Sequence, residues 1–267
     1  MKPYYEDGSV TIYHGDCREV LASAPPLRVF DAVVTSPPYG DIRDYGGHVP
    51  TDLLAVIEDL GRGLAVGGVI VWNVADQTVD GSETGESFRQ ALHAMKSGLR
   101  LHDTMIYCKE AVVFPDSNRY LPAFEYVFIF SRGAPKHFNG LKDRRNKYAA
   151  TKIHGTRREA DGTLRRPTRD GELVPEFGLR WNWWVVRTAS QEGDGTTHPA
   201  QMPMDLARAQ ISTWTAAGDV VIDPFMGSGT TLRAAKDLGR RAIGIEIEER
   251  YCEIAAQRLG QEVLALA

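Results

Sequence analysis

VVIDPFMGSGTT, at Val220–Thr231, joins an apolar run to a turn with two glycines and then to the start of a helix. Such a run is typical of a buried strand. Glycines let the backbone come close to a ligand, and the N-terminus of a helix offers unpaired N–H groups and a partial positive charge. Because ligands bind at the carboxyl ends of strands in open α/β sheets, this turn predicts a nucleotide-like ligand. A turn that serves packing alone is the alternative.

The residues around this turn narrow the kind of ligand. Glu246 ends the next predicted strand, where an acid usually binds a ribose hydroxyl. Leu232 stands where the dinucleotide fingerprint needs a small residue, and the chain has no Gly-Lys-Ser or Gly-Lys-Thr of a P-loop. Asp223 would repel a pyrophosphate but suits an ammonium group. S-adenosylmethionine carries such a group, and we expect it as the cofactor.

Strands and helices alternate along the rest of the chain. Strands are expected at 10–13, 30–34, 69–74, 103–109, 125–131, 181–186, 219–224 and 241–247, and helices at 52–64, 88–99, 202–213, 230–238 and 249–259. The pair Gly67-Gly68 is expected to end the helix before it and to turn the chain. This alternation predicts an α/β fold with a largely parallel sheet.

A second loop follows the predicted strand at 30–34. It reads Thr35-Ser36-Pro37-Pro38-Tyr39, and the strand has to end there because two prolines cannot donate to a sheet ladder. Tyr39 can stack on a flat substrate, while the Ser36 hydroxyl and the Pro37 carbonyl can accept hydrogen bonds from an amino group. Acceptors that orient the exocyclic amine of a flipped nucleobase favour attack from its nitrogen. A proline turn with a tyrosine at its rim is the alternative.

The chain is acidic overall but holds one basic segment. Its formal net charge is −4, yet residues 132–180 contain 13 of the 31 basic and only 6 of the 35 acidic side chains. A localised positive charge suits a polyanion such as nucleic acid. The segment also shows little periodicity and much Gly, Arg and Asn, so we interpret it as an inserted lobe. A solvated basic loop is the alternative.

Length and composition exclude several classes of protein. The chain has 267 residues, 43% of them hydrophobic and 25% charged, which is ordinary for a globular protein. Its apolar runs are far shorter than the roughly 20 residues that span a bilayer, and its N-terminus lacks the apolar core of a signal peptide. Three widely separated cysteines argue against a disulfide framework or a zinc site. We expect a cytoplasmic protein that uses neither a membrane nor a metal.

The two loops, in this order, resemble the β-group amino-methyltransferases of DNA, which modify cytosine-N4 or adenine-N6. In that family the catalytic motif comes first, the cofactor loop lies near the C-terminus, and the target-recognition region lies between them. Thr35–Tyr39 resembles the catalytic motif and Asp223–Thr231 the cofactor loop. Gly15-Asp16-Cys17 and the segment from Thr197 to Pro203 resemble two further cofactor-binding elements. The resemblance covers nearly the whole chain except the basic segment.

The resemblance implies a fold and a division of the chain. The implied fold is the Rossmann-like α/β sheet of S-adenosylmethionine-dependent methyltransferases, in circularly permuted order, with an inserted recognition lobe. Residues 1–131 would form the catalytic half of the domain, residues 132–180 the DNA target-recognition lobe, and residues 181–267 the cofactor-binding half of the same domain.

Candidate site residues follow from the two loops, the basic segment and the resemblance. The catalytic candidates are Ser36, Pro37, Pro38 and Tyr39. The cofactor-binding candidates are Asp16, Thr35, Thr197, His198, Asp223, Pro224, Phe225, Gly227, Ser228, Gly229, Thr230 and Glu246. The candidates for contacts with DNA phosphates are Arg144, Arg145, Arg157, Arg158, Arg165 and Arg166. Core or lobe anchors are expected at Trp181, Trp183 and Trp184, with stacking on bases as the alternative. A paired acid near the sheet end is expected at Glu125, with a role toward the substrate as the alternative.

The expected reaction is methyl transfer from S-adenosylmethionine to an exocyclic amine in double-stranded DNA. Relatives with serine at the position of Ser36 are mostly cytosine-N4 enzymes and those with aspartate mostly adenine-N6 enzymes, so cytosine-N4 is favoured and adenine-N6 is the alternative. Three other classes stay open: a nicotinamide-dependent oxidoreductase, a DNA-binding module with an inactive methyltransferase fold, and a methyltransferase of RNA or of a protein amide. A homodimer and a cognate restriction endonuclease are left open as partners.

Overall fold

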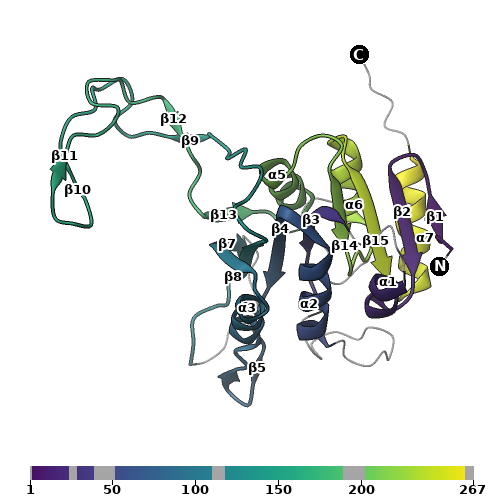
Figure 1. Cartoon of the computed structure of the whole chain (residues 1–267). Helices are drawn as coiled ribbons and strands as arrows, with labels where there is room; N and C mark the ends of the chain where they lie inside the picture. The colour runs from purple at the N-terminus through teal and green to yellow at the C-terminus, as the bar shows by residue number, and fades with distance from the viewer. Residues whose placement is uncertain (1, 24–28, 39–51, 110–117, 189–201, 262–267) are drawn as a thin grey trace. The chain divides into compact units, whose positions relative to one another are not determined.

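The computed structural model describes residues 2–23, 29–38, 52–109, 118–188 and 202–261 (Figure 1). The chain divides into two compact units. The first unit comprises Met1–Asn139 and Asn182–Ala267, and the second comprises Gly140–Trp181. Residues 132–139, at the start of the basic segment, therefore belong to the first unit. Among the described helices, none is long and apolar enough to cross a membrane.

The first unit is built on a nine-stranded sheet with the order β1-β2-β15-β14-β3-β4-β8-β7-β13. Its strands are β1 (Tyr5–Glu6), β2 (Val10–His14), β3 (Phe30–Thr35), β4 (Leu64–Val74), β7 (Arg100–Lys109), β8 (Phe124–Ser131), β13 (Trp183–Val186), β14 (Val220–Asp223) and β15 (Arg241–Glu246). Five neighbouring strands of this sheet run parallel to one another: β2, β15, β14, β3 and β4. The strands β7 and β13 are also parallel to each other. The pairs β1–β2, β4–β8 and β7–β8 are antiparallel. The predicted α/β class is confirmed, with a mixed sheet.

Helices cover both faces of this sheet (Figure 1). They are α1 (Cys17–Ser23), α2 (Leu53–Gly63), α3 (Glu86–Lys96), α5 (Met204–Trp214), α6 (Thr230–Asp237) and α7 (Glu249–Gly260). In one layer α2 packs between α1 and α3, and in the other α6 packs between α5 and α7. A small hairpin of β5 (Thr78–Val79) and β6 (Ser82–Glu83) precedes α3. The short helix α1 was not predicted from the sequence.

The core between the sheet and the layer of α1, α2 and α3 fixes the end of β4. Trp72 and Phe30 are fully buried there, and Ile57 of α2 packs in the same cluster. Each such side chain contributes about 1.5–3 kcal/mol to folding. The Trp72 Nε1–H donates to Gln90 Oε1 at 2.8 Å, so the polar atom of the buried indole is paired. This packing holds the carboxyl end of β4 beside that of β3.

The prediction of a helix stop and turn at Gly67-Gly68 is wrong. Helix α2 ends at Gly63, and both of these glycines lie inside β4. Gly67 has a φ of +81°, which residues with a side chain rarely adopt. A Cβ atom on Gly68 would lie only 2.8 Å from the backbone oxygen of Asp31 on β3. The glycines therefore mark the irregularity at which the pairing of β3 with β4 shifts register.

The second unit consists of short hairpins and loops. Strand β9 (Arg144–Arg145) pairs with β12 (Phe177–Gly178), and β10 (Arg157–Arg158) pairs with β11 (Leu164–Arg165). All of its residues are described, and every one is at least partly exposed. The form of this unit therefore rests on backbone pairing and polar contacts rather than on a hydrophobic core, as in the ion pair between Arg180 and Asp143.

Candidate cofactor and substrate site

The loop between β14 and α6 begins at a buried acid. The Oδ1 atom of Asp223 accepts a hydrogen bond from Thr35 Oγ1 at 2.6 Å and another from the Phe225 N–H at 3.1 Å. Burial raises the pKa of Asp223 to about 6, although these bonds and one from the Thr231 side chain favour the ionised carboxylate. Because Thr35 ends β3, this contact joins the proline loop to the glycine loop.

The glycines of this loop adopt backbone conformations that side chains disfavour. Gly227 has a φ of +51° and Gly229 a φ of +81°. A Cβ atom on Gly229 would lie 2.8 Å from the Cβ of Ala255, so the loop packs directly on α7. Between the two glycines, Ser228 accepts hydrogen bonds from Arg258 Nη1 at its backbone oxygen (2.8 Å) and at its Oγ (3.1 Å). The turn is thus fixed from the side of α7.

Glu246 supports the glycine loop from the end of β15. Its Oε2 accepts from the Gly227 N–H and its Oε1 from the Glu248 N–H, each at 2.9 Å. Burial raises the pKa of Glu246. A carboxylate has about four acceptor positions, so these two bonds leave Glu246 with capacity for ligand hydroxyls. Its backbone oxygen accepts from the Gly15 N–H at 2.9 Å, which ties the loop after β2 to the same edge.

A third acid follows β2. Asp16 receives Arg18 Nη2 at 2.6 Å, and this hydrogen-bonded pair lowers the pKa of the Asp16 carboxyl. The strands β2, β15 and β14 are parallel neighbours, so Asp16, Glu246 and Asp223 come together at the carboxyl ends of these strands. The sequence predicted a ligand at this end of the sheet.

The proline loop continues this edge at the end of β3. Ser36 Oγ accepts a hydrogen bond from Asn73 Nδ2 at 2.9 Å and lies 3.3 Å from the Asn73 backbone oxygen. Asn73 lies near the end of β4, the next strand in the sheet. Tyr39, Thr197 and His198, which were also predicted for the site, lie outside the described residues.

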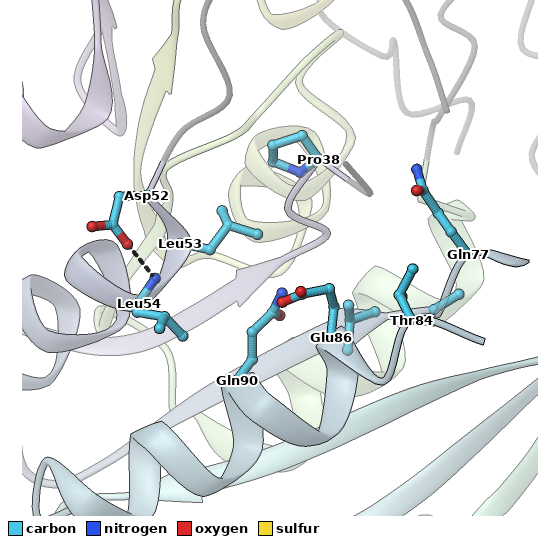
Figure 2. Close-up of a pocket in the computed structure, with 10 residues that line it drawn as sticks. Pro38, Asp52, Leu53, Leu54, Gln77, Thr84, Glu86 and Gln90 are labelled. Carbon is cyan, nitrogen blue, oxygen red and sulfur yellow. Dashed lines mark hydrogen bonds between the residues drawn. The ribbon is translucent and has the colours of Figure 1, made fainter. Parts of the chain in front are cut away.

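A pocket of about 260 Å³ opens beside Pro38 (Figure 2). It lies between the starts of α2 and α3 and the end of β4. Apolar side chains, amides, a hydroxyl and two carboxylates line it together with Pro38: Asp52, Leu53, Leu54, Val74, Ala75, Gln77, Thr84, Glu86 and Gln90. Its volume is below the roughly 300–1,000 Å³ of most ligand pockets, so it suits only a small group with a few polar atoms.

The sequence matches a known family over most of its length. A family model described as DNA methylase, with the label N6_N4_Mtase, matches residues 30–257. The orphan methyltransferase M.BamHII of Bacillus amyloliquefaciens is 46% identical over 240 residues, which are 88% of this chain and 90% of that protein. The chain belongs to the N6/N4 DNA methylase family. This membership decides against the nicotinamide-dependent oxidoreductase.

Solved structures show the same fold as this methylase. The PvuII DNA methyltransferase (cytosine-N4-specific) matches with a TM-score of 0.70 at 19% identity and covers 99% of this chain and 91% of its own. TTHA0409 from Thermus thermophilus, solved in complex with S-adenosyl-L-methionine, matches with a TM-score of 0.60 at 26% identity, covering 96% of each chain. The mixed α/β sheet of the methylase is therefore that of DNA methyltransferase structures.

Three polar residues of the methylase extend from Ser36 across β4, β8 and β7, and only one of them was predicted from the sequence. Glu125 was predicted as a paired acid, which is confirmed by its ion pair with Lys109 Nζ at 2.6 Å. Asn73 and Lys109 were missed. Asn73 is the one polar side chain in the run from Val69 to Val74, and a polar residue at the end of a buried strand is a signal that could have found it.

The tryptophans before and on β13 have different surroundings. Trp184 is buried, as expected for a core anchor, and Trp181 lies under the Arg144 guanidinium, 4.2 Å from its ring centroid. Trp181 is 54% exposed and Trp183 52%, so a core role is wrong for both, and among the described residues only Trp181 of the two has a stacking partner, Arg144, within the second unit. Because β13 is the edge strand of the sheet and side chains alternate along a strand, Trp184, next to Trp183, takes the buried side.

The six predicted DNA-binding arginines fall into two groups within the second unit. Arg144 stacks on Trp181, Arg145 is 3.8 Å from Glu176, and Arg166 is 3.5 Å from Asp170. The other three lie on the β10–β11 hairpin, and we call them the hairpin arginines: Arg157, Arg158 and Arg165. In the part of the chain that the structure describes, the hairpin arginines are exposed and form no ion pair. Their charge is thus available to an external anion.

Proposed function

We propose that this methylase transfers a methyl group from S-adenosylmethionine to the exocyclic amine of a flipped base in double-stranded DNA, with cytosine-N4 as the target. The observation that carries the proposal is the 2.6 Å hydrogen bond from Thr35 to Asp223. It joins the loop proposed to hold the target amine to the loop proposed to hold the cofactor. Two partners that react by direct transfer have to meet within a few ångströms, and this contact supplies that proximity.

The residues present fit S-adenosylmethionine. Gly227 and Gly229 let the backbone pass close to a ligand, and a side chain at Gly229 would collide with α7. Glu246 has acceptor capacity for the ribose hydroxyls. Asp223 supplies a negative charge near the proposed ammonium group, and Asp16 an acceptor near the proposed adenine. When bound, S-adenosylmethionine supplies a methyl group on a positively charged sulfur.

The proline loop is proposed to act on the amine. The Ser36 oxygen and the Pro37 carbonyl accept hydrogen bonds from the amino group and orient the nitrogen lone pair toward the cofactor side. The new nitrogen–carbon bond would form as the sulfur–carbon bond breaks, and the methylated nitrogen would release one proton to water. Tyr39 stacks on the flipped base, which offsets the few kcal/mol needed to unstack it. Pro38 and the adjoining pocket, with Leu53 on its wall (Figure 2), receive part of the target nucleotide.

Serine at position 36 supports cytosine-N4 as the target, by the resemblance to family members with serine there. Adenine-N6 is the second candidate for the same chemistry. The order of the two loops supports a circularly permuted arrangement, since β3 precedes β14 by most of the chain although the two strands are paired. The division at residues 1–131, 132–180 and 181–267 belongs to the same proposal, with the middle segment as the recognition lobe.

The hairpin arginines support DNA as the partner. They lie on one short hairpin and form no ion pair among the described residues, and guanidinium groups bind phosphate oxygens well. Such contacts fix a protein on a duplex without reading sequence. A homodimer and a cognate restriction endonuclease stay predictions, of which the first is tested by light scattering of the purified chain.

Nucleoside mass spectrometry tests the proposed reaction. The purified chain is incubated with unmethylated DNA of diverse sequence and isotope-labelled S-adenosylmethionine, and the DNA is digested. Labelled N4-methylcytosine is the expected product. Labelled N6-methyladenine would support methyl transfer to an exocyclic amine but would show that the target base is adenine and not cytosine. No label in DNA despite cofactor binding would favour RNA or a protein amide as the substrate, or an inactive DNA-binding module. Wild-type rates in both Ser36→Ala and Tyr39→Ala would refute the assignment of the proline loop.

A further inference from the structure

Four polar side chains, joined by hydrogen bonds and an ion pair, form a line that begins at Ser36 and crosses the sheet. Asn73 is 2% exposed, and its Nδ2 donates to Ser36 Oγ at 2.9 Å and to Glu125 Oε2 at 2.5 Å. Glu125 is 7% exposed, and its Oε1 lies 2.6 Å from Lys109 Nζ. The four side chains come from the end of β3, from β4, from β8 and from β7. Buried polar groups in an otherwise apolar sheet are costly, so their retention calls for a reason.

The carboxylate at the centre of this line determines which way the amide points. An ionised carboxylate only accepts hydrogen bonds, so Glu125 requires the NH₂ group of Asn73, and not its oxygen, to face it. The same NH₂ group then presents its second hydrogen to Ser36 Oγ. The serine hydroxyl lies 3.3 Å from the Asn73 backbone oxygen, to which it donates its own hydrogen. In this arrangement the Ser36 oxygen acts as an acceptor.

Lys109 stabilises this arrangement in a buried site. Burying a lone carboxylate would cost a large desolvation free energy, and a close ammonium group offsets that cost. The Lys109 side chain is 24% exposed, so the cation keeps part of its hydration. The ion pair thereby offsets the cost of burying the Glu125 carboxyl group, whose other oxygen accepts from the Asn73 amide.

We propose that Glu125 and Lys109 are positioning residues for methyl transfer, which act through Asn73 to hold the Ser36 oxygen as an acceptor for the target amine. This inference rests on the proposed function. It predicts that Glu125→Gln lowers kcat. A glutamine can present its own NH₂ group to Asn73, which allows the Asn73 side-chain amide to rotate so that its oxygen and nitrogen exchange places. Misplacing an acceptor in this way is expected to lower kcat roughly 10- to 100-fold.

A double-mutant cycle tests the route through Ser36. Methyl transfer is measured at saturating DNA and cofactor for the wild type, Ser36→Ala, Glu125→Gln and the double variant, and the Kd of S-adenosylmethionine is measured for each by calorimetry. The expected result is a double variant no slower than Ser36→Ala alone, with a Kd within about twofold of the wild type. Effects of Glu125→Gln that multiply with those of Ser36→Ala would overturn the proposal, since the residue would then act elsewhere.

A second pair of variants keeps the test valid if Glu125→Gln folds poorly. Lys109→Arg preserves the cation and is expected to retain most of kcat, whereas Lys109→Met is expected to lose it; equal losses in both would overturn the proposal. Asp7→Asn is the matched control, because Asp7 and Lys236 form a similar 2.7 Å ion pair near the start of β2, away from Ser36. Its effects are expected to multiply with those of Ser36→Ala. A wild type that transfers no methyl group would instead overturn the proposed function, and this inference with it.

Discussion

Replacing Asp223 by asparagine should remove part of the pH dependence of folding. The pKa of Asp223 rises from its ordinary 3.8 to about 6 in the folded chain. Because the folded state binds this proton more tightly than the unfolded chain, Asp223 favours folding at low pH, and that advantage is lost as the pH rises from 3.8 through about 6. With each pKa unit worth about 1.4 kcal/mol, the full loss is about 3 kcal/mol.

About half of this loss falls between pH 5 and pH 8, so the expected difference over that interval is about 1.4 kcal/mol. The assay is urea unfolding of the wild type and of Asp223→Asn at both pH values. The asparagine side chain stays neutral, so the unfolding free energy of the wild type should fall by about 1.4 kcal/mol more than that of the variant. Comparing the two proteins cancels the titration of most other groups.

Asp7→Asn is the control for this measurement. Burial alone would raise the pKa of Asp7, but hydrogen bonds from Lys236 and from Ser9 and Val10 hold it well below its ordinary value. Asp7 is therefore ionised in both the folded and unfolded states from pH 5 to pH 8, and its loss should change stability equally at both. An Asp223→Asn variant with the pH dependence of the wild type would refute the reasoning, since the buried carboxyl would then not be the group that titrates.

Three further outcomes follow from the structure. Gly229→Ala should destabilise the chain by about 1 kcal/mol more than Gly218→Ala in urea unfolding, because both have a positive φ but only the first would bring a Cβ atom against α7. Equal losses would contradict this packing. Changing the hairpin arginines to glutamine should lower the salt slope of DNA binding by about 1 per arginine, whereas the same change at arginines paired within the unit should lower it less. Burial raises the pKa values of the Cys17 and Cys252 thiols to about 12, so one equivalent, Cys108, should react with Ellman's reagent at pH 8 and three after unfolding.

The parts of the fold that depend on local signals could be predicted from the sequence. The strand–turn–helix at Val220–Thr231 was predicted because an apolar run, two glycines and a helix start lie within a dozen residues. Gly67 and Gly68 carry the same local signal as a turn, yet they lie in a strand. Their role depends on how closely β3 approaches, and that distance is set by packing between segments rather than by the glycines themselves.

The line of polar groups behind Ser36 could not be predicted in the same way. Asn73, Glu125 and Lys109 lie on three strands whose order and register bring them together. A shift of one residue in the pairing of β8 with β4 or with β7 would turn Glu125 to the other face of the sheet. Sequence patterns indicate that a strand exists but leave its register open. The exposure of Trp183 has the same origin, since it depends on β13 being an edge strand.

The central position of β14 and β15 has a consequence for synthesis of the chain. In the finished sheet these two C-terminal strands lie between β2 and β3, which are both made early. Until the ribosome has translated β14 and β15, each of the early strands keeps an unpaired edge that can bind other nascent chains. A nascent chain that stalls after β13 would therefore be a substrate for aggregation rather than a partly working enzyme.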